Sequence, residues 1–140
     1  MKTLAKLIRY HRYLVDEKRR EVRELEERAV AFEQAIDSLD AQVVAERISA
    51  ADSDFGSADY GGFAQASLVR RSSLVRELSE AADAVEEARN GLLDAFAELK
   101  RYEISLDRKE ALARQNRARR DQLELDEVSL NGHRRIGAAR

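Results

Sequence analysis

Apolar residues recur along two long stretches of the chain at alternating steps of three and four residues. The repeat runs from Leu4 to Ala50 in the first stretch and from Leu74 to Leu106 in the second. These steps place the apolar side chains on one narrow stripe of a helix, as in the seam of a coiled coil. A helix can bury so narrow a stripe only against a partner helix with the same repeat. The pattern therefore predicts two long helices that pack against each other.

The largest apolar residues of this seam occur in both helices. We expect the coiled-coil core to consist of Leu25, Phe32, Ile36, Leu39, Leu78, Val85, Leu92 and Leu99. Polar residues interrupt the seam at His11, Lys18 and Glu46. We expect His11 to lie near Tyr102 and to pack there rather than bind a ligand.

One cluster of turn-forming residues, Asp52 to Gly62, separates the two repeats. A short loop between two long helices returns them antiparallel. The sequence thus predicts an all-α fold in which two long helices form an antiparallel coiled-coil hairpin with a longer second helix. We expect a single domain over residues 1–140, with helix 1 at about 3–51, a loop at about 52–63, helix 2 at about 64–131 and a basic tail at 132–140.

The register follows if Ala50 faces Ala64, and this arrangement sets large residues opposite small ones. For example, it places Phe32 near Ala81, as interdigitated packing requires. The first helix then ends opposite about Glu110. Residues 111–130, where the apolar seam fails, would have no partner helix within the chain.

The composition is typical of a helical protein, and the small net charge does not indicate a strongly charged partner. Charged residues make up 37% of the chain, the formal net charge is −2, and there is no Cys or Pro. The absence of Cys fits a reducing compartment. The first fifteen residues carry charges throughout, so they resemble neither a signal peptide nor a membrane span. We therefore expect an intracellular protein.

Catalytic or metal-binding patterns are not recognisable in the sequence. The two histidines, His11 and His133, stand at opposite ends of the sequence, and no pair of acids is distinguished as acid and base. Gly61 and Gly62 lack the lysine of a phosphate-binding loop. We expect a protein that is not an enzyme and has no cofactor or metal.

Two clusters remain as candidate contacts. Basic residues dominate the end that carries both termini: Lys2, Lys6, Arg9, Arg12, Arg108, Lys109, Arg114, Arg117, Arg119 and Arg120. They form either a solvated helix face or a contact for an acidic protein or a nucleic acid. Few aromatic residues lie near them, which favours a protein partner over a nucleic acid.

The second cluster consists of aromatic residues at the acidic loop end, namely Phe55, Tyr60 and Phe63. These residues either plug the hairpin turn or contact a partner.

The opening LAKLIRYHRYLVDEKRREVRELE is similar to the start of flagellar export proteins of the FliJ family. The later stretch DAFAELKRYEISLDRKEALARQNRARRDQLELDEV resembles the same family. The total length, the Gly/Asp loop near the middle, the longer second helix and the QxxLDE-like segment at residues 122–127 add to the resemblance.

The resemblance implies a soluble, non-enzymatic stalk of the flagellar type III export apparatus. Such a stalk binds and activates a hexameric export ATPase, contacts a membrane export-gate protein and takes part in handling export chaperones. Nucleic acid is not among its partners, and its place is cytoplasmic, peripheral to the inner membrane at the flagellar base. On this view the ring contact is Lys2, Lys6, Arg9, Arg12, Arg114, Arg117 and Arg120, and the gate contact is Phe55, Tyr60 and Phe63.

Three other interpretations remain open. The chain could be an injectisome stalk homologue, a generic coiled-coil adaptor or chaperone with an apolar tip, or an RNA-binding helical arm. Net acidity argues against RNA binding.

Overall fold

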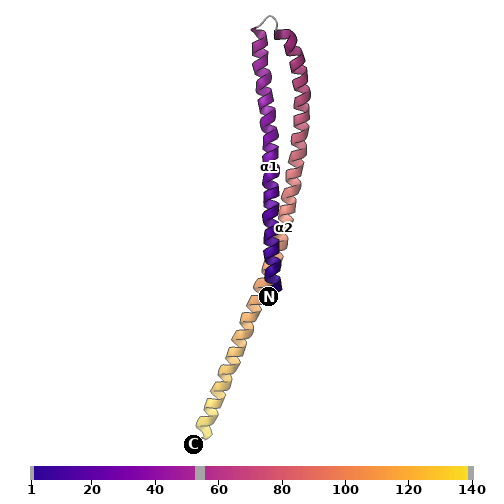
Figure 1. The fold of residues 1–140 in the computed structure, drawn as a ribbon. Coiled ribbons are helices and arrows are strands. Elements are labelled where there is room, and N and C mark those ends of the chain that lie inside the picture. Colours follow the sequence, from indigo (N-terminus) through magenta and orange to yellow (C-terminus); the bar gives the residue numbers. More distant parts are fainter. Residues whose placement is uncertain (1, 53–55, 139–140) are drawn as a thin grey trace. The chain divides into compact units, whose positions relative to one another are not determined.

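Two helices account for nearly all of the chain that the structure describes. A computed structural model describes residues 2–52 and 56–138, with side chains from 59 onward in the second range. Helix α1 spans Lys2–Ala51 and helix α2 spans Gly56–Ala138 (Figure 1). The two helices pack against each other in opposite directions. The predicted all-α hairpin with a longer second helix is therefore confirmed.

The seam is visible in the burial of individual side chains. Every buried apolar side chain of the described residues falls on the predicted repeat, from Ile8 (4% exposed) in α1 to Leu99 (8% exposed) in α2. Among the expected core residues, Ile36, Val85 and Leu99 are buried, whereas Leu25, Phe32, Leu39, Leu78 and Leu92 are half-buried. A seam between only two helices stays open to solvent along both edges, so many of its side chains are covered only in part.

The contacts divide the chain into two units, which are described separately. One unit combines the described residues of Met1–Arg12 and Ala97–Arg140, and the other is Tyr13–Phe96. We call them the terminal unit and the hairpin unit. The prediction of a single domain is not tested by this division.

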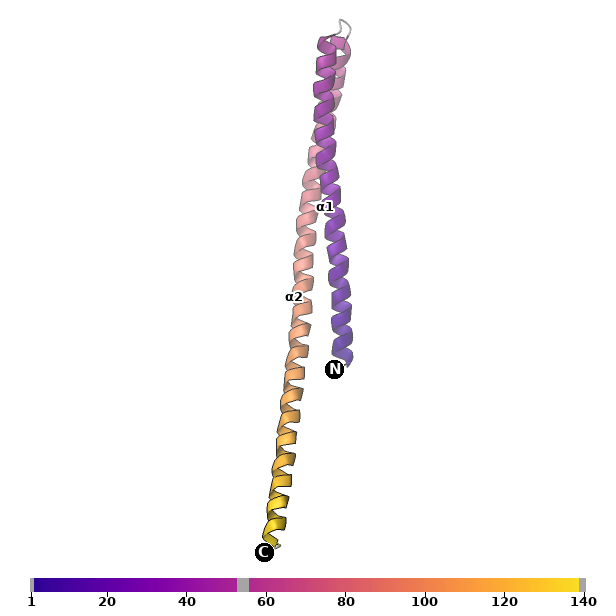
Figure 2. The same cartoon turned by 90° about the vertical axis from the view of Figure 1, so that its left-hand side faces the viewer.

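In the hairpin unit, α1 and α2 run side by side from the loop end (Figure 2). Phe32 and Ala81 line the same hollow. Two ion pairs cross between the helices: Arg89 with Glu26 at 2.9 Å and Arg71 with Asp40 at 2.9 Å. All these contacts agree with the predicted register to within one helical turn.

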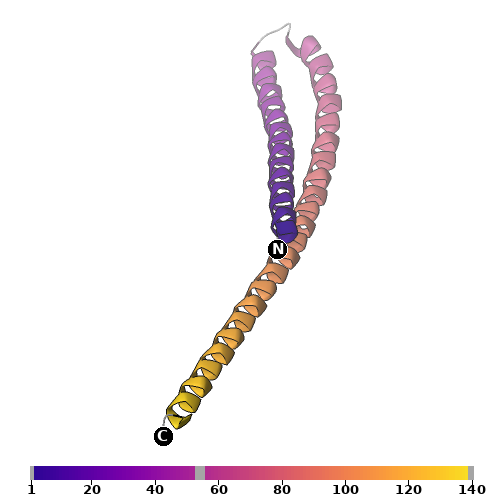
Figure 3. The same cartoon turned by 60° about the horizontal axis from the view of Figure 1, so that its bottom comes forward.

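In the terminal unit, the first turns of α1 pack on α2, and α2 then continues past the residue at which α1 begins (Figure 3). All described residues from 107 to 138 are exposed except Ala113, which is half-buried. This segment, which we call the overhang, is helical throughout.

Two predicted boundaries are wrong. Helix α2 begins at Gly56, so most of the loop placed at 52–63 is helix, and α2 continues to Ala138, through most of the tail placed at 132–140. Gly61 and Gly62 adopt helical backbone without positive φ. Each costs about 1 kcal/mol relative to Ala in a helix. We attribute the earlier start to Tyr60 and Phe63, which are half-buried in the hairpin unit, because tertiary packing overrides local propensity.

Candidate functional site

An apolar hollow lies between the two helices near the loop end of the hairpin unit. Its volume is about 390 Å³, and it is lined by Leu39, Asp40, Val43, Val44, Tyr60, Ala64, Ser67, Leu68 and Arg71. We call it the Tyr60 hollow. Val44 and Leu68 remain 46% and 64% exposed at its edge, whereas Ser67 is buried. The hollow therefore offers accessible apolar surface that the intrachain packing does not cover.

One charged pair lies beside the Tyr60 hollow. The Arg71 guanidinium donates two hydrogen bonds to Asp40, from Nε at 2.9 Å and from Nη2 at 3.4 Å. Hydrogen bonding to Asp40 and the charge of that carboxylate raise the pKa of Arg71. This two-pronged pair links α1 and α2 at the hollow and fixes the position of both side chains.

The three aromatic residues predicted as a gate contact differ in where they lie. Tyr60 lines the hollow, and Phe63 is half-buried one turn further along α2. Phe55 lies outside the described residues. The sequence reasoning did not identify Val44 and Leu68 as part of this surface. Their signal was present as apolar residues that stand next to the seam rather than on it.

The basic residues predicted as a ring contact are exposed. Lys2, Lys6 and Arg9 follow steps of four and three residues, so they share one stripe on α1. Arg12 differs, because its guanidinium lies 3.6 Å from the Glu103 carboxylate of α2. Glu103 therefore partly offsets the charge of the cluster, and this pair was not predicted, because the positions of basic residues alone do not reveal their cross-helix neighbours.

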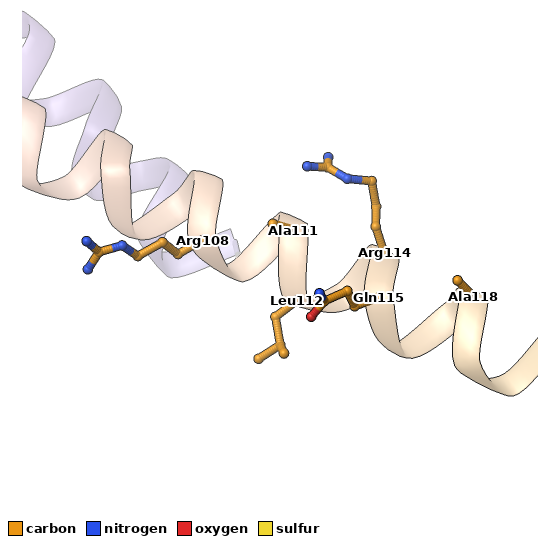
Figure 4. A pocket seen from close by; sticks show the side chains of 6 residues that line it. All are labelled: Arg108, Ala111, Leu112, Arg114, Gln115 and Ala118. Atoms are coloured by element: carbon orange, nitrogen blue, oxygen red, sulfur yellow. The ribbon is translucent and has the colours of Figure 1, made fainter.

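The other basic residues of this cluster belong to the overhang. Arg114, Arg117 and Arg120 are exposed on α2 in the terminal unit. Figure 4 shows the Arg108 and Arg114 side chains extending away from the helix on either side of Ala111. The terminal unit thus combines cations from the start of α1 with cations from the exposed overhang of α2.

Next to this cluster, an aromatic group holds the first turns of α1 against α2. The rings of His11 and Tyr102 stack with centroids 4.6 Å apart, and Tyr10 meets His11 edge to face at 5.5 Å. The expectation that His11 lies near Tyr102 is confirmed. Of these two pairs, only the His11–Tyr102 pair joins the two helices, and stacked aromatic pairs contribute about 0.5–1.5 kcal/mol beyond the area that they bury.

Metal sites and membrane-spanning helices are the other features considered for the described residues. Within that part of the chain, no group of three or more His, Cys, Asp or Glu side chains could hold a metal ion. Neither of the helices described is long and apolar enough to cross a membrane.

Comparison with known proteins identifies the group to which this two-helix arrangement belongs. The family described as "Flagellar FliJ protein" matches residues 1–137. The chain belongs to the FliJ family. It is also similar to two proteins named Flagellar FliJ protein from Caulobacter vibrioides, strains NA1000 / CB15N and ATCC 19089 / CIP 103742 / CB 15. In each case the identity is 27% over 129 residues, covering 92% of this chain and 93% of the relative.

Solved structures give no significant match to the chain. Membership of the FliJ family makes this a flagellar export-related protein, as the resemblance of the two sequence stretches implied.

Proposed function

We propose that this FliJ-family chain is a non-enzymatic stalk that binds and activates the export ATPase ring and links it to the membrane export gate. The proposal places it in the cytoplasm, peripheral to the inner membrane at the flagellar base. The observation that carries the ring contact is the overhang, an exposed helix with a dense set of arginines. Export chaperones are a further class of partner within this proposal.

The charge of the terminal unit supports an acidic, polar binding site in the ring. Lys2, Lys6 and Arg9 are exposed together, and the overhang adds Arg114, Arg117 and Arg120. Exposed cations steer and orient an acidic partner, and their effect falls as salt rises.

The test of the ring contact is a charge-reversal variant with a matched control. Replacing Arg114, Arg117 and Arg120 with Glu should abolish stimulation of the cognate ATPase at low salt, while the helix content of the chain is unchanged. The control reverses three exposed arginines of the hairpin unit, at positions 23, 70 and 76, which changes the net charge equally. The control should stimulate the ATPase as the unmodified chain does.

The ring contact would be refuted if both triple variants stimulate the ATPase as well as the unmodified chain. Equal loss in both variants would mean that only overall charge matters, and the terminal unit would then have no special role.

The Tyr60 hollow supports the gate contact, because it is an apolar surface between the helices of the hairpin unit that remains open. Tyr60→Ser should leave ATPase stimulation intact but impair motility, since coupling to the gate would be weakened. Leu93→Ser removes an apolar side chain that is 65% exposed elsewhere on α2 and should have no effect on motility. Normal motility of the Tyr60→Ser variant would remove the hollow from the proposal.

A further inference from the structure

The overhang carries a second repeat that differs from the hairpin seam. It begins at Ala111, Gln115 and Ala118 and continues with alternating steps of four and three to Ser129, Gly132 and Ile136. We call it the uncharged stripe, because none of its residues is ionisable although Arg, Asp and Glu surround it. All of its residues are exposed. A regular uncharged repeat on an otherwise charged helix is the pattern of a helix–helix contact.

The continuation of the hairpin seam over the same segment is a poorer contact. That seam would place Lys109, Arg120 and Glu127 between two helices. Burying such charges without partners is costly. Burying the uncharged stripe against another helix therefore costs less free energy than burying the continuation of the hairpin seam.

Two hollows of the terminal unit lie along this stripe. One surrounds Ala111, Gln115 and Ala118 (Figure 4), and the other is lined by residues that include Gly132 and Ile136. On the stripe itself, Ala111, Ala118 and Gly132 have a short side chain or none, so the backbone of another helix can approach closely at these positions. Large apolar residues of the stripe are left open beside them, since Ile136 is 63% exposed. Isolated helices are marginal in water, so an occupant would stabilise the overhang.

We propose that a second copy of this chain occupies the uncharged stripe, with the two overhangs packed antiparallel about a two-fold axis. The stripe is complementary to itself in this direction. Ala111 of one copy lies opposite Ile136 of the other, and Gln115 lies opposite Gly132. Large residues therefore meet small ones in the outer layers, as close packing requires.

The charges beside the stripe favour the antiparallel direction. This pairing places Arg119 of each copy beside Asp126 of the other, and the symmetry makes the contact twice. It also brings Arg114 of each copy toward Arg135 of the other, a repulsion that the symmetry likewise makes twice, so the attractive and repulsive pairs are equal in number. A parallel pairing would instead set Arg114 beside Arg119 and Asp121 beside Asp126, so that every charged contact would be repulsive. Of the two directions, only the antiparallel one contains attractive contacts between charged side chains.

The dimer does not depend on the proposed ring contact. Among the arginines of the proposed ring contact on the overhang, Arg114 flanks the uncharged stripe, whereas Arg117 and Arg120 lie outside the stripe and the positions that flank it, so they remain exposed in the pair. Loss of dimerisation in Leu125→Asp and loss of ATPase stimulation after reversal of Arg117 and Arg120 alone can therefore be observed separately.

The first experiment compares two neighbouring leucines in the full chain by light scattering during size-exclusion chromatography. Leu125 lies on the stripe and is 64% exposed, whereas Leu123 lies off it and is 62% exposed. The unmodified chain and Leu123→Asp should reach twice the 15.9 kDa mass of one chain as concentration rises. Leu125→Asp should stay monomeric, with the helix content that the unmodified chain has at concentrations at which it too is monomeric. A monomeric unmodified chain at every concentration, or dimer loss only in Leu123→Asp, would overturn the proposal.

The second experiment tests direction with single-cysteine variants, since the chain has no cysteine of its own. Ala118 of one copy should face Ser129 of the other. A mixture of Ala118→Cys and Ser129→Cys should therefore form a disulfide between chains, and each variant alone should not. In the antiparallel pair, like positions would stand about 16 Å apart along the helix, beyond disulfide reach. Crosslinking of Ala118→Cys with itself would mean a parallel pair and would overturn the antiparallel assignment.

Discussion

Truncation of one buried leucine should measure how much of the stability lies in the seam. Leu74 is 3% exposed in the hairpin unit. Leu74→Ala removes three carbon atoms from this site, and a buried methylene contributes about 0.8 kcal/mol. The transfer term is then roughly 2.4 kcal/mol. Measured losses for such truncations range from about 2 to 5 kcal/mol, with the larger values at sites that keep a closed cavity. The seam is open at both edges, so we expect about 2–3 kcal/mol.

The assay is urea unfolding of the full chain followed by far-ultraviolet circular dichroism. The matched control is Leu93→Ala, which makes the same chemical change on the same helix and unit at a side chain that is 65% exposed. Its free energy of unfolding should change by less than about 0.5 kcal/mol, as for most surface substitutions. If the two variants lose equal stability, the assignment of Leu74 to the seam is wrong.

Three further predictions concern the register, the loop end and the seam. Phe32→Cys with Ala81→Cys should form a disulfide within one chain, seen as a monomer of changed mobility, and crosslinks only between chains would contradict the antiparallel register. Gly62→Ala should raise the free energy of unfolding by up to about 1 kcal/mol, because the residue is helical and no neighbouring atom lies within 4 Å of the position that the added β-carbon would take. Leu92→Asp should lower the melting temperature through the cost of a half-buried carboxylate, whereas Asp at the exposed Ser105 should leave it unchanged.

The sequence predicted the two helices because the seam repeat is regular and long, and it predicted their direction because the turn-forming cluster between them is short. It also predicted the aromatic contact of His11, since an antiparallel register leaves Tyr102 as its neighbour. The start of α2 was predicted too late, because Gly61 and Gly62 are poor helix formers and were taken as part of the loop. Tyr60 stands four residues before Ala64 and so continues the same repeat. Packing of this side chain outweighs the local preference of the glycines.

The candidate contacts were harder to predict than the fold. A list of basic residues does not show which of them meet an acid across the helices, as Arg12 meets Glu103 at 3.6 Å. The Tyr60 hollow depends on which residues beside the seam come together, and predicting it requires the register to better than one turn. The uncharged stripe is readable in the sequence. It was not predicted, because the hairpin seam was extended over the same residues and a second repeat was not considered.

The two cross-helix ion pairs of the hairpin unit have a consequence for how the chain reaches a single alignment. A seam that repeats every seven residues is nearly degenerate, because a slip of one heptad again sets apolar residues against apolar residues. Glu26 and Asp40 lie on α1, and their partners Arg89 and Arg71 lie on α2. A slip in either direction would carry Glu26 to Ala82 or Phe96 and would separate Asp40 from Arg71 as well. Each exposed pair contributes little to stability. Together they favour the observed alignment, because a slip of one heptad in either direction loses both pairs.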